Sequence, residues 1–371
     1  MIRYAIAIVF CYMLFVWLGC KKDTIKFYRL QPSAGDTVTL RGIFSRERAD
    51  SAYNSAFLDF STNTQTAVVR SSWDLGFYCG TDFRVIINHT VGAAVAVSDK
   101  TDLNAVTIAD TVALVPRLTL NSDTGDLTTV DPVAPADSAA YLAGTAIPSV
   151  PGSSKILILN RGRSTNLGRR NWIKMKITAT NSGYSVTWGT ITINGVVNNN
   201  NLYSSFSINK DASYNFRYYS FSSSAVTYEP AKTLWDISYG QSTYKITGND
   251  GITRPVPTTD FMLINFVNGV KAAQLNDDPS GINYANIDST KLAAITFSGA
   301  RDVIGVNWRT VALVGNAANS GAIEYNTKVF YLIKDRDNSV YAVSFAGGGS
   351  RGAPIVRYRR IYNGPFHQTG S

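Results

Sequence analysis

The sequence predicts an all-β protein made of two tandem, similar antiparallel β-sheet domains. The first observation behind this prediction is an internal repeat: the stretch Ser72–Phe77, which contains Trp73-Asp74, returns as Leu234–Tyr239 with Trp235-Asp236. The second is that apolar residues alternate with a period of two, as they do in strands that bury one face. The third is the scarcity of segments with helical periodicity.

The repeat continues in the same order along the chain. The further matching pairs are Thr81–Phe83 with Thr259–Phe261, Gly92–Ala94 with Gly269–Ala273, Thr101–Thr107 with Thr290–Thr296, and Lys155–Leu159 with Lys328–Leu332. One short match could arise by chance, but a series in the same order indicates a tandem duplication. Function is therefore to be sought in one unit, in the other, or between them.

Each unit is expected to end in a β-hairpin. In the first unit, Trp172–Thr178 alternates apolar and polar residues, and Tyr184–Ile191 follows a turn that ends at Gly183. Asn, Ser and Gly are the residues that such a turn favours. In the second unit, Val329–Ile333 and Val340–Phe345 repeat the design.

Turn-forming and polar stretches set the predicted domain boundaries. The run Asn198–Asn201 is typical of a linker between domains, and Ser122–Ser154, rich in Pro, Ser, Asp and Gly, is expected to be an insertion in the first domain. The expected organisation is a signal peptide over 1–19, a lipidated tether over 20–39, a β domain over 40–197, a second over 203–363 and a tail over 364–371. Short helical turns are compatible with Thr101–Val106 and Thr290–Ile295.

The first residues have the layout of a secretory signal. Arg3 precedes an apolar run from Tyr4 to Leu18, which is shorter than the roughly 20 residues that a membrane-spanning helix requires. The following Gly19-Cys20 resembles a bacterial lipobox, although Trp17 stands where that motif usually has Leu. We therefore expect Cys20 to carry the lipid that attaches the protein to the membrane. An uncleaved N-terminal anchor is the alternative.

Charge and cysteine content narrow the class of protein. The net charge is +9, and the basic residues are mostly dispersed, with local patches at Arg161–Arg170 and Arg357–Arg360. These patches are interpreted as charged, solvated strand edges; attraction to an anionic surface or ligand is the alternative. Nucleic acid is not expected as a partner behind a secretion signal. Once the signal is removed and Cys20 is acylated, only Cys79 remains, so no internal disulfide is expected.

The Trp-Asp motif has two interpretations. A Trp at the start of a strand can bury a large apolar area, while the following Asp points to the other face and caps a turn. This structural interpretation explains why the motif occurs in both copies. The functional alternative is that the two motifs form a shared pocket floor.

Several motifs of the second unit, taken in order, resemble the HmuY family of haem-binding lipoproteins. They are an aromatic Ser-Phe strand, a Trp-Asp strand, an apolar hairpin and a closing strand, at Tyr218–Ser222, Trp235-Asp236, Lys328–Phe345 and Pro354–Tyr358. Residues 214–362 cover nearly a whole family domain. The first unit fits more loosely, through Phe57–Phe60, Trp73-Asp74 and Lys155–Ile191. The resemblance implies an all-β fold, display on the outer membrane of a Gram-negative bacterium, and capture of haem or of haemoproteins for an outer-membrane receptor.

The family's iron ligands are not matched. The resemblance implies two axial His or Met side chains, but the stretch between Trp308 and Lys328, where one is expected, contains neither. A haem iron accepts imidazole or thioether ligands. The candidates are His89, Met262, Met175 and His367, of which His89 is the best single ligand and Met262 the second. Each also has a structural interpretation. His89 would be a hydrogen-bonded His at the end of a strand, Met175 and Met262 would be core residues, and His367 would lie in a terminal tail.

The sequence thus leaves two classes of function and predicts that the protein is not an enzyme. It has no Gly-x-Ser-x-Gly, His-Glu-x-x-His or P-loop motif. Carboxylate pairs for glycoside hydrolysis stay open, because the fold sets their spacing. The first class is a ligand-binding lipoprotein with haem or a related porphyrin as cofactor. The second is a surface scaffold or adhesion module that binds a glycan or a partner protein; twenty Tyr and six Trp suit either class.

Overall fold

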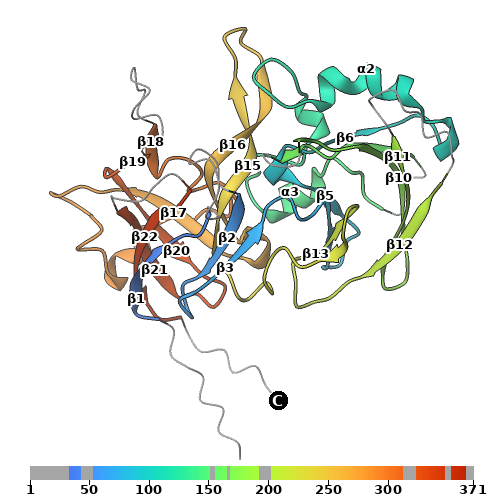
Figure 1. Cartoon of the computed structure of the whole chain (residues 1–371). Coiled ribbons are helices and arrows are strands. Elements are labelled where there is room, and N and C mark those ends of the chain that lie inside the picture. The colour runs from blue at the N-terminus through green and yellow to red at the C-terminus, as the bar shows by residue number, and fades with distance from the viewer. Residues whose placement is uncertain are drawn as a thin grey trace, which may run out of the picture. The chain divides into compact units, whose positions relative to one another are not determined.

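The computed structural model describes residues 33–42, 53–150, 155–164, 168–191, 202–311, 323–346 and 352–364. In these residues the protein consists mainly of antiparallel strands, which confirms the predicted all-β class (Figure 1). Both predicted hairpins are present. Trp172–Ala179 (β10) pairs with Gly183–Ile191 (β11), and Val329–Lys334 (β20) pairs with Val340–Ala346 (β21).

Two five-stranded sheets contain these hairpins. Sheet D has the order β12-β11-β10-β7-β6, where β12 is Ser204–Asn209, β7 is Leu157–Asn160 and β6 is Ala94–Val97. Sheet A has the order β1-β22-β21-β20-β17, where β1 is Gly35–Thr39, β22 is Ile355–Tyr362 and β17 is Lys271–Asn276. The two orders correspond strand by strand, as a duplication requires.

Two four-stranded sheets contain the Trp-Asp motifs. Sheet C has the order β14-β13-β4-β5, with β14 at Ser224–Val226, β13 at Phe216–Ser220, β4 at Leu75–Tyr78 and β5 at Val85–Ile87. Sheet B has the order β16-β15-β2-β3, with β16 at Thr253–Ile264, β15 at Ile237–Thr247, β2 at Asn54–Asp59 and β3 at Thr64–Val69. Two-stranded pairs complete the set: β8 (Arg163–Ser164) with β9 (Gly168–Arg169), and β18 (Arg309–Val311) with β19 (Ile323–Tyr325).

The two repeats exchange their first three strands. Strands β2 and β3 of the first repeat join β15 and β16 of the second, whereas β13 and β14 of the second join β4 and β5 of the first. Strands β1 and β12 are exchanged in the same way, because β1 pairs with β22 and β12 pairs with β11. The short connection Arg70–Asp74 carries the chain from sheet B across to sheet C.

This exchange differs from the expectation of two separately folded domains. The predicted ranges 40–197 and 203–363 do not each contain whole sheets, since sheets B, C and D all pair strands from both ranges. Strand β1 lies in the stretch that was predicted to be a tether. These residues form a strand because they pair with β22. Ser33–Ser371 likewise form one compact unit. The predicted signal peptide, Cys20 and the tail beyond residue 364 lie outside the described residues.

Apolar side chains connect the sheets in the succession A, B, C, D. One core cluster joins sheets A and B around Leu58, Met262 and Tyr341, and another joins sheets C and D around Phe77, Met175 and Val186. A third, mostly aromatic, lies between B and C. The view in Figure 1 shows this succession from the left of the picture to the right. The third cluster holds both Trp73 and Trp235 and is where the two repeats meet.

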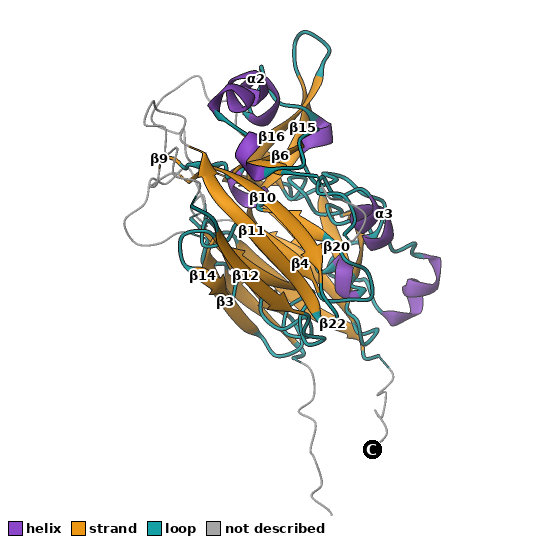
Figure 2. Cartoon of the chain, turned by 90° about the vertical axis from the view of Figure 1, so that its right-hand side faces the viewer, coloured by secondary structure: helices purple, strands orange, loops and turns teal. Residues whose placement is uncertain are grey.

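Helices are few and lie at the periphery of the sheets (Figure 2). The short turns predicted near 101–106 and 290–295 are the 3-10 helices η2 (Leu103–Ala105) and η5 (Ser289–Ala294). Three more 3-10 helices follow strands or lie in the insertion: η1 (His89–Val91), η3 (Leu127–Thr129) and η4 (Phe266–Asn268). The predicted Ser122–Ser154 insertion contains η3 and the helix α3 (Ser138–Ala143).

The helix α2 (Ile108–Leu118) was not predicted. It contains Pro116 and several β-branched residues, which weaken the helical pattern in the sequence. Its first turn is held by a capping box between Thr107 and Asp110. Among the described residues, no helix is long and apolar enough to span a membrane, and Cys79 is a free thiol.

Candidate functional site

The two Trp-Asp motifs hold the exchanged hairpins. The Asp74 carboxylate accepts a hydrogen bond from the backbone N–H of Phe221, which follows β13 (2.8 Å). The Asp236 carboxylate accepts the corresponding bond from Phe60, which follows β2 (2.9 Å). Each motif of one repeat therefore caps the first hairpin of the other. This agrees with the structural interpretation, in which the Asp of the motif caps a turn. The capped turn belongs to the other repeat.

Two buried asparagines brace the motifs, and the sequence analysis missed them. Asn88 donates from its amide to the carbonyls of Arg70 and Trp73 (3.0 and 2.7 Å). Asn265 donates to the carbonyls of Lys232 and Trp235 (both 2.9 Å). In both repeats the Asn is followed four residues later by a Gly, and this spacing is visible in the sequence. The structure explains the Gly, because Gly92 and Gly269 have positive φ angles of 66° and 88°.

The surroundings of the two aspartates have opposite charge. Asp74 forms buried ion pairs with Arg161 (2.7 Å) and Arg170 (2.9 Å). No such pair is present for Asp236 among the described residues. Burial raises its pKa well above the usual range, and the nearby carboxylates of Asp59 and Asp335 raise the pKa further. The duplication has kept the hairpin cap and has changed the charge around it.

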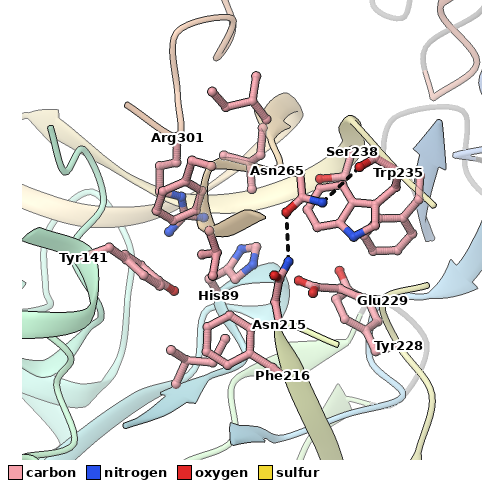
Figure 3. Close-up of a pocket in the computed structure, with 16 residues that line it drawn as sticks. His89, Tyr141, Asn215, Phe216, Tyr228, Glu229, Trp235, Ser238, Asn265 and Arg301 are labelled. Carbon is pink, nitrogen blue, oxygen red and sulfur yellow. Dashed lines mark hydrogen bonds between the residues drawn. The ribbon is translucent and has the colours of Figure 1, made fainter. Parts of the chain in front are cut away.

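A small pocket with a mixed apolar and polar lining lies where the two repeats meet. Its cavity volume is about 40 Å³. Figure 3 shows His89 in the middle of the view, with Arg301 and Tyr141 on one side and Glu229 and Trp235 on the other. The lining residues come from both repeats and from the insertion: Phe57, Ile86, His89, Tyr141, Asn215, Phe216, Tyr228, Glu229, Trp235, Ser238, Leu263, Ile264, Asn265, Phe266, Val267 and Arg301. Trp235 thus contributes to a pocket wall, whereas Trp73 does not line the cavity.

His89 is held as a neutral imidazole. Its Nδ1 lies 3.1 Å from the hydroxyl of Ser242, and its backbone carbonyl accepts a hydrogen bond from Thr243 (2.9 Å). Burial lowers the pKa of His89 well below its usual value, and the positive charge of Arg301 lowers it further. His89 is partly exposed, and it lines the cavity. Neutral imidazole is the form that binds metals.

The pocket is lined by one cation, Arg301, and by one acid of raised pKa, Glu229, whereas Asp131 is a buried acid outside the lining. Burial raises the pKa of Glu229 to about 7, although hydrogen bonds from Tyr218 and Asn215 and the charge of Arg301 oppose the shift. Burial raises the pKa of Asp131 to about 6, and this carboxylate accepts hydrogen bonds from the backbone N–H groups of Ile87 and Ala146 (2.9 and 3.0 Å). The charge of the pocket therefore changes with pH close to neutrality.

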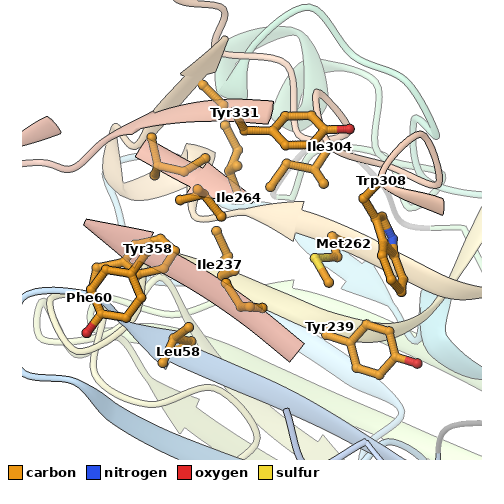
Figure 4. Close-up of a cluster of buried hydrophobic side chains, with 14 of the residues drawn as sticks. Leu58, Phe60, Ile237, Tyr239, Met262, Ile264, Ile304, Trp308, Tyr331 and Tyr358 are labelled. Atoms are coloured by element: carbon orange, nitrogen blue, oxygen red, sulfur yellow. The ribbon is translucent and has the colours of Figure 1, made fainter. Parts of the chain in front are cut away.

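The predicted iron ligands are not brought together. Met262 is fully buried in the core between sheets A and B, beside Tyr239 and Trp308, and does not line the pocket (Figure 4). Met175 is likewise fully buried in the core between sheets C and D, as its structural interpretation predicted. His367 lies outside the described residues. Of the three candidates that the structure describes, His89 alone lines the pocket.

The described residues do not fit a haem held by two axial side chains. The cavity of about 40 Å³ is far smaller than the roughly 300–1,000 Å³ of pockets that enclose larger organic ligands. In addition, His89 has no His or Met opposite it among the residues that line the pocket.

Comparison with known proteins identifies a family for part of the chain. The sequence model of the family described as "HmuY protein" matches residues 51–215, which run from just before β2 to Asn215. No curated protein and no solved structure matches the chain. The match contains His89 and the first Trp-Asp motif, and it falls on the unit in which the sequence analysis found the looser resemblance. Residues 51–215 are therefore similar to the HmuY family, which is associated with haem binding.

Proposed function

We propose that this protein is a non-catalytic, lipid-anchored binding protein of the outer membrane that belongs to the HmuY family but lacks an axial haem clamp. The observation that supports this proposal is the environment of His89. It is the one candidate ligand among the described residues that lines this pocket, and the pocket is far smaller than one that could enclose a porphyrin. The protein then acts as a surface module that binds a partner protein or a glycan.

The contacts of His89 also support a non-catalytic role. Ser242, the hydroxyl closest to the imidazole, is 2% exposed and is not a lining residue of the pocket. Its Oγ accepts a hydrogen bond from Arg301 (3.2 Å). A nucleophile must reach the substrate with its base in hydrogen-bond range. The Ser-His contact is therefore a structural contact between η1 and β15.

Haem capture through His89 alone is the second candidate function. It is favoured by the neutral state of the imidazole and by the family association of residues 51–215. A single ligand gives a weaker iron bond than two, and two strong ligands are what produce a low-spin spectrum.

A haemin titration separates the two candidates. We expect wild type to show no sharp low-spin Soret band. His89→Ala and Met262→Ala should give the same spectrum as wild type, because no second axial ligand lies opposite His89 and because Met262 is enclosed in the core between sheets A and B. The measurement is the visible absorption spectrum over the titration. A tight complex that His89→Ala abolishes would establish the second candidate. A tight low-spin complex unaffected by either substitution would contradict both assignments.

Membrane attachment through Cys20 is tested separately. One or two acyl chains on a terminal Cys hold a protein on a membrane without a spanning helix. We expect Cys20→Ser to leave the precursor unprocessed or to release the protein, as shown by fractionation and by loss of label from a radioactive fatty acid. Cys11→Ser, a change within the predicted signal peptide, serves as the matched control and should fractionate like wild type. Outer-membrane recovery of Cys20→Ser at the wild-type level would refute the anchor.

A further inference from the structure

Four partly exposed aromatic rings lie together beside the core of sheets C and D. They are Trp188 of β11, Phe206 of β12, Tyr219 of β13 and Phe221, which follows β13. Phe206 stacks on Tyr219 with ring centroids 3.5 Å apart, and Trp188 lies 4.9 Å from Phe221. Tyr219 and Phe221 are 5.7 Å apart, so the four rings form one connected set, which we call the aromatic rim.

The equivalent positions between sheets A and B are closed. Leu58 and Phe60 are the counterparts of Tyr219 and Phe221, because they make the same hydrogen bonds to the Trp-Asp motif of the other repeat. Leu58 and Phe60 are both 0% exposed, whereas Tyr219 and Phe221 keep part of their surface open. Exposed apolar side chains that gather in one place mark surfaces that bind a partner.

The aromatic rim includes a residue of an open sheet edge. Strand β12 is the outermost strand of sheet D, and its outer side is paired with no strand that the structure describes. Its sequence, Ser-Ser-Phe-Ser-Ile-Asn, has neither the charged residues nor the proline that usually protect an edge from pairing with another chain. The strand offers about 20 Å of edge, at roughly 3.4 Å per residue.

The other sheet edges are short, covered or blocked. Strands β5, β6 and β14 have only three or four residues. Strand β16 contains Pro255 and Pro257, β1 contains the charged Asp36, and β17 is bridged to Ser298. Strand β3 is uncharged as well, but its Gln65 amide is already bound to the backbone of the chain that follows β1. Of the edges that the structure describes, β12 is therefore the most suited to pairing with another chain.

The bonds between β12 and β11 determine which backbone groups point outward. The N–H of Lys210 donates to the carbonyl of Ser182 (2.8 Å), so these residues form a hydrogen-bonded pair. In an antiparallel ladder such pairs alternate with pairs whose N–H and C=O groups point away. In the register of β12 on β11, the groups of Phe206 therefore point toward β11, and those of Ser205 and Ser207 point to solvent. Ser205 and Ser207, both exposed, offer two donors and two acceptors.

We propose that β12 is a dimerisation edge, which pairs antiparallel with β12 of a second copy of this chain about a twofold axis at Phe206. In this register Ser205 of each copy faces Ser207 of the other, so all the outward groups of both residues are bonded. Phe206 faces its own copy as a cross-strand aromatic pair, which covers part of the aromatic rim.

The charge distribution favours a second copy as the partner. A twofold axis places a strand opposite itself, so a charge on the strand would meet a like charge. The net charge of +9 opposes self-association through most of the surface, whereas β12 has no charged residue. This inference goes beyond the proposed function, because it requires neither the pocket at His89 nor a ligand.

The molar mass of residues 21–371 in solution tests the dimer. This range contains every residue that the structure describes and lacks the predicted lipid anchor. The measurement is sedimentation together with size-exclusion chromatography and light scattering, over protein concentrations of about 1–500 μM, because an interface of one strand per copy is small and hence weak. We expect a reversible equilibrium between monomer and dimer. A monomer at every concentration would overturn the proposal.

Three variants of one residue make the test specific. Ser207→Pro removes an outward N–H and leaves the bonds to β11 in place, since an edge strand tolerates Pro where its N–H faces solvent. It should raise the Kd of the dimer at least tenfold. Ser207→Ala, the matched control, keeps the N–H and should dimerise like wild type. Ser207→Lys changes no backbone group but brings two like charges to the same face of the interface, so it should weaken the dimer most at low salt.

Circular dichroism and urea unfolding of each variant show whether it is folded. If Ser207→Pro unfolds, the salt-dependent effect of Ser207→Lys decides. A dimer that neither the Pro nor the Lys variant weakens would place the interface elsewhere and overturn the proposal. Equal weakening by Ser207→Ala and Ser207→Pro would also overturn it, because the backbone N–H would then not be the group that binds.

Discussion

A fragment of residues 72–230 should fold as a monomeric β protein, whereas a fragment of residues 40–197 should not fold. The second range is the domain that the sequence predicts, but it lacks β12, β13 and β14 and contains the β2–β3 hairpin without β15, the other strand that pairs with β2. It would leave Phe57, Leu58 and Phe60 exposed, all of them buried in the whole protein. The first range contains all of sheets C and D.

The core between sheets C and D explains the expected result. All its buried members lie between Leu75 and Ile208, and Tyr219 and Phe221 pack against them. The Asp74 cap and its two arginines are inside the same range. Circular dichroism, urea unfolding and size-exclusion chromatography of both fragments measure the difference. A cooperative transition for 40–197, or none for 72–230, would show that the exchange of strands is not what stabilises this half.

The strand pattern could be predicted from the sequence because it depends on local residues. The hairpins at 172–191 and 329–346 combine alternating apolar residues with turn-forming sequences, and both are present. The exchange of the first hairpins could not be predicted. In a duplicated chain, β2 finds almost the same partner pattern in β4 of its own repeat as in β15 of the other. The short Arg70–Asp74 connection leads from sheet B to sheet C, and no residue pattern in the sequence indicates this crossing.

The pocket could be predicted only in part. His89 was found because few residue types bind iron and the chain has two His. Glu229, Arg301 and Tyr141 lie far apart in the sequence, in a loop, another loop and a helix of the insertion, so only the fold brings them to one cavity. Met262 was chosen for its chemistry, but strand β16 places it in a core. Alternation of apolar residues along a strand predicts that a side chain such as Met262 is buried. It does not predict whether that side chain lies in a packed core or in a binding pocket.

Asp74→Asn should lower the free energy of unfolding by about 3–5 kcal/mol, while Asp236→Asn should change it by less than about 1 kcal/mol. In the first variant, Arg161 and Arg170 stay buried without a carboxylate, and their side chains are only 8% and 7% exposed. In the second, burial and the nearby acids raise the pKa of Asp236 and so disfavour its charged form, which means that removing the charge costs little. An Asn side chain has nearly the shape of a carboxyl group, and its oxygen can still accept the bond from Phe60.

The comparison is a matched one, because the repeat places Arg161 and Asp335 at equivalent positions. Asn160 pairs with Ala94, two residues after Gly92, and Lys334 pairs with Lys271, two residues after Gly269; the next residues are Arg161 and Asp335. Burial raises the pKa of Asp335 to about 6, so the folded protein binds protons more tightly here than the unfolded chain. Stability from this site is therefore full below the unfolded pKa of about 4 and is lost as the pH rises through 6. Urea unfolding at pH 5 and pH 8 should show a smaller loss in Asp236→Asn than in wild type, and the two aspartate variants should differ most at the higher pH. Equal destabilisation by both variants at pH 7 would mean that the opposite charges around the two caps do not affect stability.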